Sequence, residues 1–378
     1  MESRQILLIG FEYPPDTGVG SVRISKFSKY LPQEWDIHVL TKPANANIRS
    51  GRDNVTVHQV PPIWSTAPKT FDQIRWAPKL VTAVQSLHKQ YSFDCIWQTA
   101  NPFLPLIAVP IYKRFTGTKI IVDLRDSWTL HPYSKLTTIF GRLYDKISEV
   151  MEPRVLQAAD AVTVATDGMN RAYSDSYPQM GAKFHTVNNG YDRDDFPQVE
   201  ADSTDGFDIV YAGKFSNFRD IEPFIRALSE VQSQHDVSFI HVGNPEKSVE
   251  SIVNRYGLDQ SYRCTGYVGR ETVAQVIHKS DLGLAISGGS PQEMTTKIFD
   301  YMACETPILG CGPEGSMTDA ISEFEYGYTV PNETDRIKST LLKIIKQHPE
   351  SLGTGPYQKY TREESAQTLA RIIEETIG

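Results

Sequence analysis

The feature that most constrains the fold of this chain is an alternation of short apolar runs with amphipathic helical patterns along most of its 378 residues. In the first half, apolar runs at residues 5–10, 36–41 and 119–124 are separated by helical patterns such as residues 19–31. This alternation is typical of a parallel sheet with helices packed on both faces. It stops in a polar, turn-rich stretch and restarts at residue 207. We therefore predict an α/β protein with two Rossmann-like, doubly wound domains.

The composition restricts the class of protein. Hydrophobic residues make up 40% of the chain and charged residues 22%, as in soluble globular proteins. Basic residues are neither dense nor interleaved with stacking aromatic residues, so nucleic acid is not an expected partner. The N-terminal apolar run is too short for a signal peptide, and no run has the length of a membrane span. Four widely spaced cysteines without a Cys-x-x-Cys pair favour reduced, buried thiols in the cytoplasm, namely Cys95, Cys264, Cys304 and Cys311.

One segment of the first half is relevant to membrane binding. Residues 63–91 contain Trp64, Trp76 and several basic residues but only one acid, Asp72. Such a segment would suit an anionic membrane surface or a lipid-linked acceptor, or it would form a solvated basic helix face. We expect a cytoplasmic protein and keep peripheral membrane contact through the N-terminal domain as an alternative.

The most informative stretch of the second half is the loop and helix that follow the strand-like run 282–287. The loop contains two glycines and a proline, and the first turn of the helix carries Thr295, Thr296 and Lys297. Amide groups at a helix N-terminus, together with hydroxyls and an ammonium group, attract phosphate. Asp300 lies one turn later on the same face, where a carboxylate is suited to ribose hydroxyls. This spacing indicates a nucleotide site, with an ordinary capped surface helix as the alternative.

A second group of cations follows the first strand of the second half. The strand-like run 207–212 leads into Gly213, and Lys214 and Arg219 come directly after it. Both side chains are able to reach a pyrophosphate at the carboxyl end of the strand and to offset the charge that forms when a phosphate leaves.

The corresponding turn in the first half contains Gly18 and Gly20, just before a helix. Glycines there allow close approach of a ligand or form a plain tight turn.

An acidic cluster at residues 192–195 is interpreted as a turn cap, and we expect no metal site.

Charged and aromatic residues follow the strand-like run 119–124. They form an acid–base and acceptor-binding edge, or an ion-pair network that positions a loop. These residues are Asp123, Arg125, Asp126, Trp128 and His131.

Five motifs in order resemble those of the GT-B fold glycosyltransferases, specifically the retaining family 4 type (glycosyl transferases group 1). They are PPDTGVG at residues 14–20, DLRDSW at 123–128, NNGYDRDDF at 188–196, AGKFSNFRD at 212–220 and TTKIFDYMACETPIL at 295–309. The resemblance covers nearly the whole chain.

The resemblance implies two Rossmann-like domains that face each other across a cleft. We expect an acceptor-side domain at residues 1–195, a linker at 196–206 and a nucleotide-sugar-binding domain at 207–355. The last segment, residues 356–378, would be a helix that packs back on the N-terminal domain.

The resemblance also implies roles for individual residues. Lys214 and Arg219 would contact the diphosphate and Asp300 the ribose, while the backbone around Val268 would meet the base. The other donor-binding residues would be Gly18, Gly20, Gly213, Gln292, Thr295, Thr296 and Lys297. The acceptor would lie near Asp126, with Arg125, Trp128 and His131 beside it.

This sequence departs from the family pattern where the family has a Glu eight residues before a second acid. Here the second acid is Asp300 and the earlier position is Gln292, with Glu293 adjacent. We assign Glu293 to the donor sugar, so the expected catalytic residues are Asp126, Lys214, Arg219 and Glu293.

The expected activity is transfer of a sugar, with retention, from a nucleoside diphosphate sugar to a hydroxyl of a glycan or lipid-linked acceptor. No metal or other cofactor is expected, because two cations and a helix N-terminus would supply the positive charge. The pathway would be cell-surface polysaccharide synthesis. Two alternatives are a sugar-nucleotide epimerase on the same fold and a non-catalytic nucleotide-sugar-binding subunit.

Overall fold

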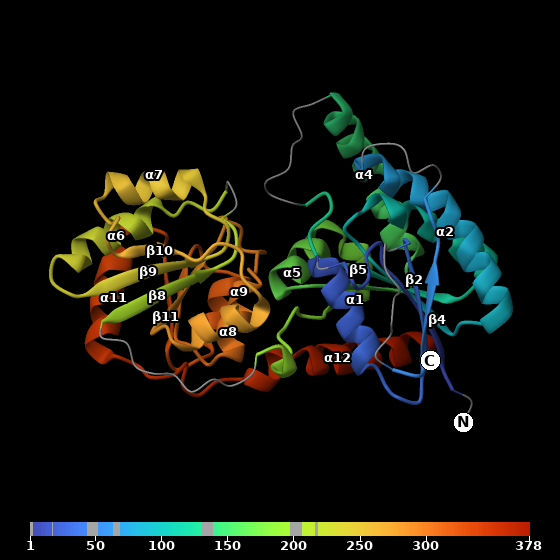
Figure 1. The fold of residues 1–378 in the computed structure, drawn as a ribbon. Coiled ribbons are helices and arrows are strands. Elements are labelled where there is room, and N and C mark those ends of the chain that lie inside the picture. The colour runs from blue at the N-terminus through green and yellow to red at the C-terminus, as the bar shows by residue number, and fades with distance from the viewer. Residues whose placement is uncertain are drawn as a thin grey trace. The chain divides into compact units, whose positions relative to one another are not determined.

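The computed structural model describes residues 3–16, 18–43, 52–62, 69–130, 139–196, 206–215 and 218–378. The chain divides into two compact units (Figure 1). Unit 1 consists of Met1–Asn189 together with Arg362–Gly378, and unit 2 of Gly190–Thr361. The chain therefore passes from one unit to the other after Asn189 and again after Thr361. These points differ from the expected boundaries at residues 195 and 355, because residues 190–196 and 356–361 pack within unit 2.

The described part of unit 1 contains a parallel sheet in the order β3-β2-β1-β4-β5-β6-β7. Its strands are β1 (Gln5–Ile9), β2 (Asp36–Thr41), β3 (Val55–Gln59), β4 (Cys95–Thr99), β5 (Lys119–Leu124), β6 (Ala161–Val164) and β7 (Phe184–Thr186). Its helices are α1 (Val19–Tyr30), α2 (Lys69–Tyr91), α3 (Val109–Thr116), α4 (Ile139–Ala158), α5 (Asp167–Ser176) and α12 (Arg362–Ile377), with the 3-10 helices η1 (Leu104–Ala108) and η2 (Pro178–Lys183).

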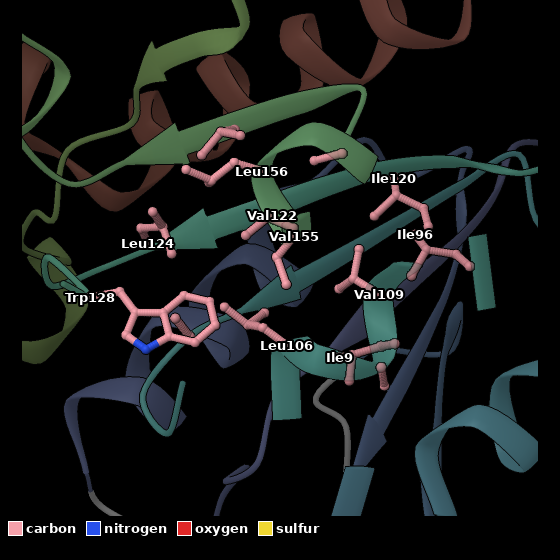
Figure 2. Close-up of a cluster of buried hydrophobic side chains, with 14 of the residues drawn as sticks. Ile9, Ile96, Leu106, Val109, Ile120, Val122, Leu124, Trp128, Val155 and Leu156 are labelled. Atoms are coloured by element: carbon pink, nitrogen blue, oxygen red, sulfur yellow. The ribbon is translucent and has the colours of Figure 1, made fainter. Parts of the chain in front are cut away.

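Two apolar cores form on the two faces of this sheet, because alternate strand residues point to opposite sides. Leu7 and Ile9 join the core under α2, α3, α4 and α5, which Figure 2 shows in part. Ile6 and Leu8 join the core under α1 and α12. In α12 the buried residues recur at helical spacing, as Ala366, Leu369 and Ile373 do, so the last helix completes one layer of unit 1.

The described part of unit 2 contains a second parallel sheet, in the order β10-β9-β8-β11-β12-β13. Its strands are β8 (Phe207–Ala212), β9 (Val237–Val242), β10 (Tyr262–Cys264), β11 (Leu282–Ile286), β12 (Ile308–Cys311) and β13 (Gly327–Val330). Its helices are α6 (Glu222–Gln232), α7 (Lys247–Arg255), α8 (Arg270–His278), α9 (Lys297–Ala303), α10 (Ser316–Ser322) and α11 (Thr334–Gln347), with η3 (Arg193–Asp195) and η4 (Tyr357–Tyr360) as 3-10 helices. The predicted fold class of two doubly wound α/β domains is confirmed.

Two predicted elements differ from the structure. The helix expected at residues 103–115 is divided into η1 and α3, and Pro110 lies at the start of α3, where it lacks the N–H that a continuous helix would need. The strand expected at residues 263–268 ends at Cys264, and Gly266 follows with a φ of +73°. Val268 therefore lies in the turn before α8.

Candidate functional site

The sheet order of unit 2 identifies the place where a ligand is expected. Strands β8 and β11 are neighbours, and the helices that follow them, α6 and α9, belong to cores on opposite faces of the sheet. The loops after these strands therefore diverge at their carboxyl ends, and open parallel sheets bind ligands at such a switch point. The loop after β8 begins with Gly213, and the loop after β11 begins with Ser287.

The turn at Gly213 requires glycine. Its φ is +110°, and a Cβ added there would lie 3.3 Å from Cε of Lys297. The carbonyl oxygen of Gly213 lies 2.9 Å from Nε2 of His241, and burial lowers the pKa of His241. A neutral imidazole that donates from Nε2 therefore fixes this turn. His241 is an ordinary strand residue in the sequence, so no local pattern predicted this contact.

Arg219 and Glu293 connect the two loops. A guanidinium nitrogen of Arg219 donates to one carboxylate oxygen of Glu293, and the other oxygen accepts a hydrogen bond of 2.7 Å from the amide of Gly288. The Arg219 side chain is only 12% exposed. Its Nε is buried and has no hydrogen-bond acceptor among the described residues. The guanidinium thus keeps one buried N–H for a further acceptor, since an unpaired buried donor is unfavourable.

Lys297 brings a second positive charge to the same place. Its ammonium nitrogen lies 4.9 Å from the ring centre of Tyr211 and its stem lies against Gly213. Burial, followed by repulsion from Arg219, lowers the pKa of Lys297 to about 8. An anion between the two cations would remove this repulsion, so the cluster of Gly213, Arg219, Glu293 and Lys297 is suited to a phosphate group.

Lys214 is not part of this cluster. Its side chain is exposed, while its backbone carbonyl accepts a hydrogen bond of 3.2 Å from the Tyr211 hydroxyl. Among the described contacts, none joins the Lys214 ammonium to Arg219, Glu293 or Lys297. The structure therefore brings together two of the three predicted cations of this unit.

The remaining predicted donor residues surround α9. The helix starts at Lys297, with Thr296 as its N-cap residue but without a side-chain capping bond. Thr295 is buried and Thr296 exposed. The backbone amide of Gln292 donates to the hydroxyl of Ser290 at 3.3 Å. Val268 packs partly against the core of α8 and α9, so its backbone remains as the part that a base would meet.

Asp300 has a partner that the sequence did not predict. A guanidinium nitrogen of Arg270, the first residue of α8, lies 3.8 Å from a carboxylate oxygen of Asp300 and 3.5 Å from one of Asp195. The same guanidinium lies over the ring of Phe196, 4.8 Å from its centre. A ribose at Asp300 would therefore share the carboxylate with Arg270.

Asp192 accepts a hydrogen bond from the Asp194 amide, which confirms the turn-cap interpretation of the acidic cluster.

The carboxyl end of β5 in unit 1 carries the predicted acceptor-side residues. Asp126 is half exposed and accepts a hydrogen bond of 2.9 Å from Asn101, and Nε of Arg125 lies 3.3 Å from its carboxylate. Gly20 leaves room for Arg125, because an added Cβ would lie 3.2 Å from the guanidinium, and Gly18 is the N-cap residue of α1.

Two further predictions at this edge have different outcomes. Trp128 is only 4% exposed and lies among the apolar side chains of the core (Figure 2). Its ring stacks on Phe103. Its assignment as an acceptor contact is therefore wrong for the indole ring, because the apolar core takes up that surface. His131 lies outside the described residues.

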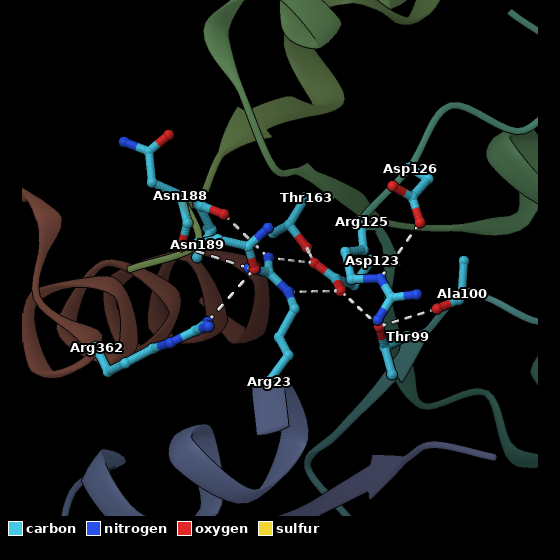
Figure 3. Close-up of polar contacts among 11 residues, drawn as sticks. Arg23, Thr99, Ala100, Asp123, Arg125, Asp126, Thr163, Asn188, Asn189 and Arg362 are labelled. Carbon is cyan, nitrogen blue, oxygen red and sulfur yellow. Dashed lines mark hydrogen bonds and ion pairs between the residues drawn. The ribbon is translucent and has the colours of Figure 1, made fainter. Parts of the chain in front are cut away.

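A buried ion pair lies next to this edge, and Figure 3 shows its partners. The guanidinium of Arg23 on α1 donates to both carboxylate oxygens of Asp123, at 2.7 and 3.0 Å, and neither side chain is exposed. Thr99 and Thr163 donate to the same carboxylate, each at 2.7 Å. Asp123 thus has the loop-positioning role that was the alternative interpretation of this motif.

The network extends to both points where the chain leaves unit 1. Arg23 donates to the carbonyl of Val187 at 3.0 Å and to the amide oxygen of Asn189 at 3.1 Å. Arg362, the first residue of α12, donates to the same oxygen of Asn189 at 3.4 Å. Arg23 was not predicted as part of this network, since nothing near residue 23 in the sequence indicates a partner 100 residues away.

Metal ligands are not grouped in the described part of the chain. No set of three or more His, Cys, Asp or Glu side chains there is arranged to hold a metal ion. The four cysteines are free, and Cys95, Cys304 and Cys311 are buried as predicted, whereas Cys264 is only half-buried.

Comparison with known proteins identifies the family. Residues 20–190 match the model of the glycosyl transferase 4-like domain, and residues 206–347 match that of the glycosyl transferases group 1. A Bacillus subtilis protein named as a teichuronic acid biosynthesis glycosyltransferase, TuaH, is 21% identical over 244 residues, which are 61% of this chain and 59% of that protein. The chain thus spans about 59% of the length of this curated relative.

Solved structures share the fold. Sucrose-phosphate synthase of Thermosynechococcus elongatus superimposes with a TM-score of 0.78, at 16% identity and 98% coverage of both chains. Anabaena HepE, in complex with UDP and glucose, superimposes with a TM-score of 0.67, at 15% identity over 98% of this chain and 100% of that one. The two matched family models show that the chain belongs to the group 1 glycosyltransferases, and the sheet order together with the superimposed structures shows that it has the GT-B fold.

Proposed function

We propose that this glycosyltransferase moves a sugar, with retention, from a nucleoside diphosphate sugar to a hydroxyl of a glycan or lipid-linked acceptor. Cell-surface polysaccharide synthesis is the pathway that we infer, and the relation to TuaH supports it. The HepE structures, which contain UDP, UDP with glucose or UDP-glucose, favour a UDP-sugar as the donor. The proposed donor site lies in unit 2 and the proposed acceptor edge in unit 1.

The observation that carries this proposal is the cluster at the switch point of the second sheet. Arg219 and Lys297, from the loops after two neighbouring strands, come together around Gly213, and Glu293 positions Arg219. A diphosphate is the part of a sugar nucleotide that needs two such cations. Positive groups fixed in a partly buried site stabilise the charge that forms on a leaving phosphate.

The reaction follows from these positions. The bond between the anomeric carbon and the diphosphate oxygen breaks, and the electron pair goes to the diphosphate held by Arg219 and Lys297. The acceptor hydroxyl attacks the face that the diphosphate leaves, which gives retention, and its proton passes to the departing phosphate oxygen. In this scheme leaving-group stabilisation provides most of the acceleration, and no side chain acts as a nucleophile.

The other residues around the cluster would hold the rest of the donor. Asp300 is proposed to bind the ribose hydroxyls, the Val268 backbone the base, and Glu293 and Gln292 a sugar hydroxyl. Asp126 is proposed to bind the acceptor hydroxyl, since its carboxylate is half exposed at the carboxyl end of β5. We propose that no metal is required, because Arg219 and Lys297 supply the two charges.

A substitution tests the role of Arg219. Arg219→Ala should lower kcat by about 100-fold, the effect of removing one group that stabilises developing charge. Donor consumption is measured by release of nucleoside diphosphate, over a panel of nucleotide sugars. Arg226→Ala is the matched control, since Arg226 is exposed and pairs only with Glu230 on α6 in the described contacts. Unchanged turnover in Arg219→Ala would reject the proposed role.

Two further measurements separate the alternatives. NMR of the donor incubated without acceptor would reveal an epimerised sugar if the chain were an epimerase. Binding of UDP without any turnover across the acceptor panel would indicate a non-catalytic subunit.

Treatment with EDTA tests the proposed independence of metal. We expect the activity to be unchanged by EDTA, and a loss of activity that added Mg²⁺ restores would contradict metal independence.

A further inference from the structure

The segment that the sequence favoured for membrane contact has a different role where it is described. Trp76 on α2 is buried, and its indole N–H donates to the carbonyl of Val60 at 2.8 Å, so this ring serves the core. Trp64 lies outside the described residues. None of the described helices combines the length and the apolar character of a membrane span.

Asn101 in unit 1 has a backbone conformation that the neighbouring secondary structure does not explain. Its φ is +67°, in the left-handed region that favours glycine. Three other non-glycine residues described by the structure have a positive φ, namely Ser92, Glu305 and His348. Each of them follows the end of a helix, α2, α9 or α11, where a left-handed residue is an ordinary termination. Asn101 instead comes two residues after the strand β4.

Asn101 lies at the switch point of the sheet in unit 1. Strands β1 and β4 are neighbours, and the helices that follow them, α1 and α3, belong to cores on opposite faces of the sheet. The loops after these strands therefore diverge at their carboxyl ends, as the loops after β8 and β11 do in unit 2. Open parallel sheets bind ligands at such a point. An unfavourable backbone conformation at a ligand edge indicates a functional constraint.

The side chain of Asn101 contacts the residue that we propose for the acceptor. Its Nδ2 donates a hydrogen bond of 2.9 Å to Oδ2 of Asp126. A carboxylate only accepts hydrogen bonds, so the amide nitrogen of Asn101 faces it rather than the amide oxygen. Nε of Arg125 lies 3.3 Å from the same Oδ2, and Figure 3 shows this ion pair. Both donors therefore hold one oxygen of Asp126, and no described hydrogen bond occupies Oδ1.

Three segments of unit 1 meet around this carboxylate. At Gly20, near the start of α1, an added Cβ would lie 3.7 Å from the carbonyl oxygen of Asn101 and 3.2 Å from the guanidinium of Arg125. The side chain of Arg125 is 11% exposed, whereas that of Asp126 is 47% exposed. The carboxylate is thus fixed at Oδ2 by its neighbours and leaves Oδ1 to accept a hydrogen bond from a hydroxyl group.

The amide group of Asn101 is the property that folding alone would not require. Asn101 is exposed, and a solvent-exposed contact between two loops adds little to the stability of a fold. Glycine adopts a positive φ at a lower cost than asparagine does. A glycine at this position would therefore satisfy the backbone, but it would leave Asp126 without the donor from this loop.

We propose that Asn101 is a positioning residue of the acceptor site. Its amide, together with Arg125, holds Oδ2 of Asp126 and thereby directs Oδ1 toward a hydroxyl group of the acceptor. This inference rests on the proposed function, because Asn101 acts through Asp126. It assigns Asn101 no contact with the donor.

Two substitutions separate the amide from the backbone. Asn101→Gly keeps the left-handed conformation and removes the amide, and Asn101→Asp keeps the shape but replaces the donor with a second carboxylate. Transfer is measured from UDP-glucose, UDP-galactose or UDP-N-acetylglucosamine to octyl glucoside, with UDP binding by isothermal titration beside it. Both variants should lower kcat for transfer by about tenfold, because the carboxylate is no longer held in one orientation. The Kd of UDP should not change.

A double-mutant cycle with Asp126 distinguishes positioning from a structural role. Asp126→Ala should also lower transfer, and Asn101→Gly should cause no further loss in the Asp126→Ala background, because its effect passes through that carboxylate. Ser92→Gly is the matched control, since Ser92 has a φ of +54° and lies before β4, at the opposite end of the strand. It should leave transfer unchanged. Equal urea midpoints for all variants establish that each one is folded.

The possible failures are distinguishable. Full transfer activity in Asn101→Gly, or an equal loss from this substitution with and without Asp126, would overturn the inference and leave the proposed reaction intact. Unchanged transfer in Asp126→Ala would remove the acceptor role of Asp126, and the inference with it, while the donor site of unit 2 would stand. Absence of transfer by the unchanged chain, although it binds UDP, would overturn the inference together with the proposed activity.

Discussion

Replacement of Arg23 by methionine should destabilise unit 1 strongly. Arg23 and Asp123 are both fully buried and share two hydrogen bonds. Methionine fills a similar volume but leaves the carboxylate with the hydroxyls of Thr99 and Thr163 alone. It also removes the side-chain donor of the Val187 carbonyl and one of the two donors of the Asn189 amide oxygen, which keeps its bond from Arg362.

The expected cost can be worked out from these losses. Removing one partner of a buried ion pair leaves an uncompensated charge and costs about 3–5 kcal/mol. A domain of this kind unfolds with a free energy of about 5–15 kcal/mol, so the variant would lose a large part of its stability. With a urea dependence of about 1–3 kcal/mol per molar, the unfolding midpoint should fall by roughly 1–5 M.

Tryptophan fluorescence during urea unfolding reports this change selectively. All five tryptophans lie within residues 1–189 of the sequence, and the positions 190–361 of unit 2 contain none. Circular dichroism, which follows both units, should then show a second transition at the midpoint of the unchanged protein.

Two matched variants separate charge burial from other effects. Arg4→Met removes a partly exposed pair in the same unit, in which Arg4 lies 3.8 Å from Asp94, and it should cost less than about 1 kcal/mol. Removing both partners in Arg23→Met with Asp123→Leu should cost less than Arg23→Met alone, because no buried carboxylate remains. A cost for Arg23→Met equal to that for Arg4→Met would refute the reasoning.

Three further predictions concern the site and the acid side of stability. UDP binding should weaken about tenfold between pH 7 and pH 9, because Lys297 has a pKa of about 8 in the free protein and only its charged form attracts phosphate. Isothermal titration should show this loss of affinity with rising pH in the unchanged chain. The pH dependence should be absent in Lys297→Met. Gly213→Ala should weaken UDP binding by tenfold or more, since the backbone φ is +110° and the new Cβ would press on Lys297. Gly117→Ala is the control for backbone strain alone, because Gly117 has a φ of +67° with open space around it. Burial, with the nearby His58, lowers the pKa of His38 from 6.5 to about 4, so the unfolded chain binds more protons than the folded chain between these pH values. The free energy of unfolding should therefore fall as the pH falls through this window, by about 2 kcal/mol between pH 7.5 and pH 5. Urea midpoints should show this loss of stability, and His38→Gln should reduce it.

The sequence by itself determined the secondary structure and the parts of the site that are close in sequence. Alternating apolar runs predicted the order of strands and helices, because each strand must bury a face and each connecting helix must cover it. The strand, glycine and cation order identified Gly213 and Arg219, and the loop before α9 identified Lys297. These patterns depend on residues that are close together in the sequence, so they can be recognised without knowing which residues are in contact in the fold.

Only the tertiary structure decided which distant residues meet. The Arg23 guanidinium meets Asp123 across 100 residues, and α12 joins unit 1 although the chain before it belongs to unit 2. Arg219 is held by Glu293, 74 residues later, while Lys214, next to the same glycine, stays outside the cluster. Trp76 and Trp128 looked like surface residues in the sequence and are part of the core. A short-range pattern specifies how a segment folds, but the partner of a buried charge depends on which segments the sheet order makes neighbours.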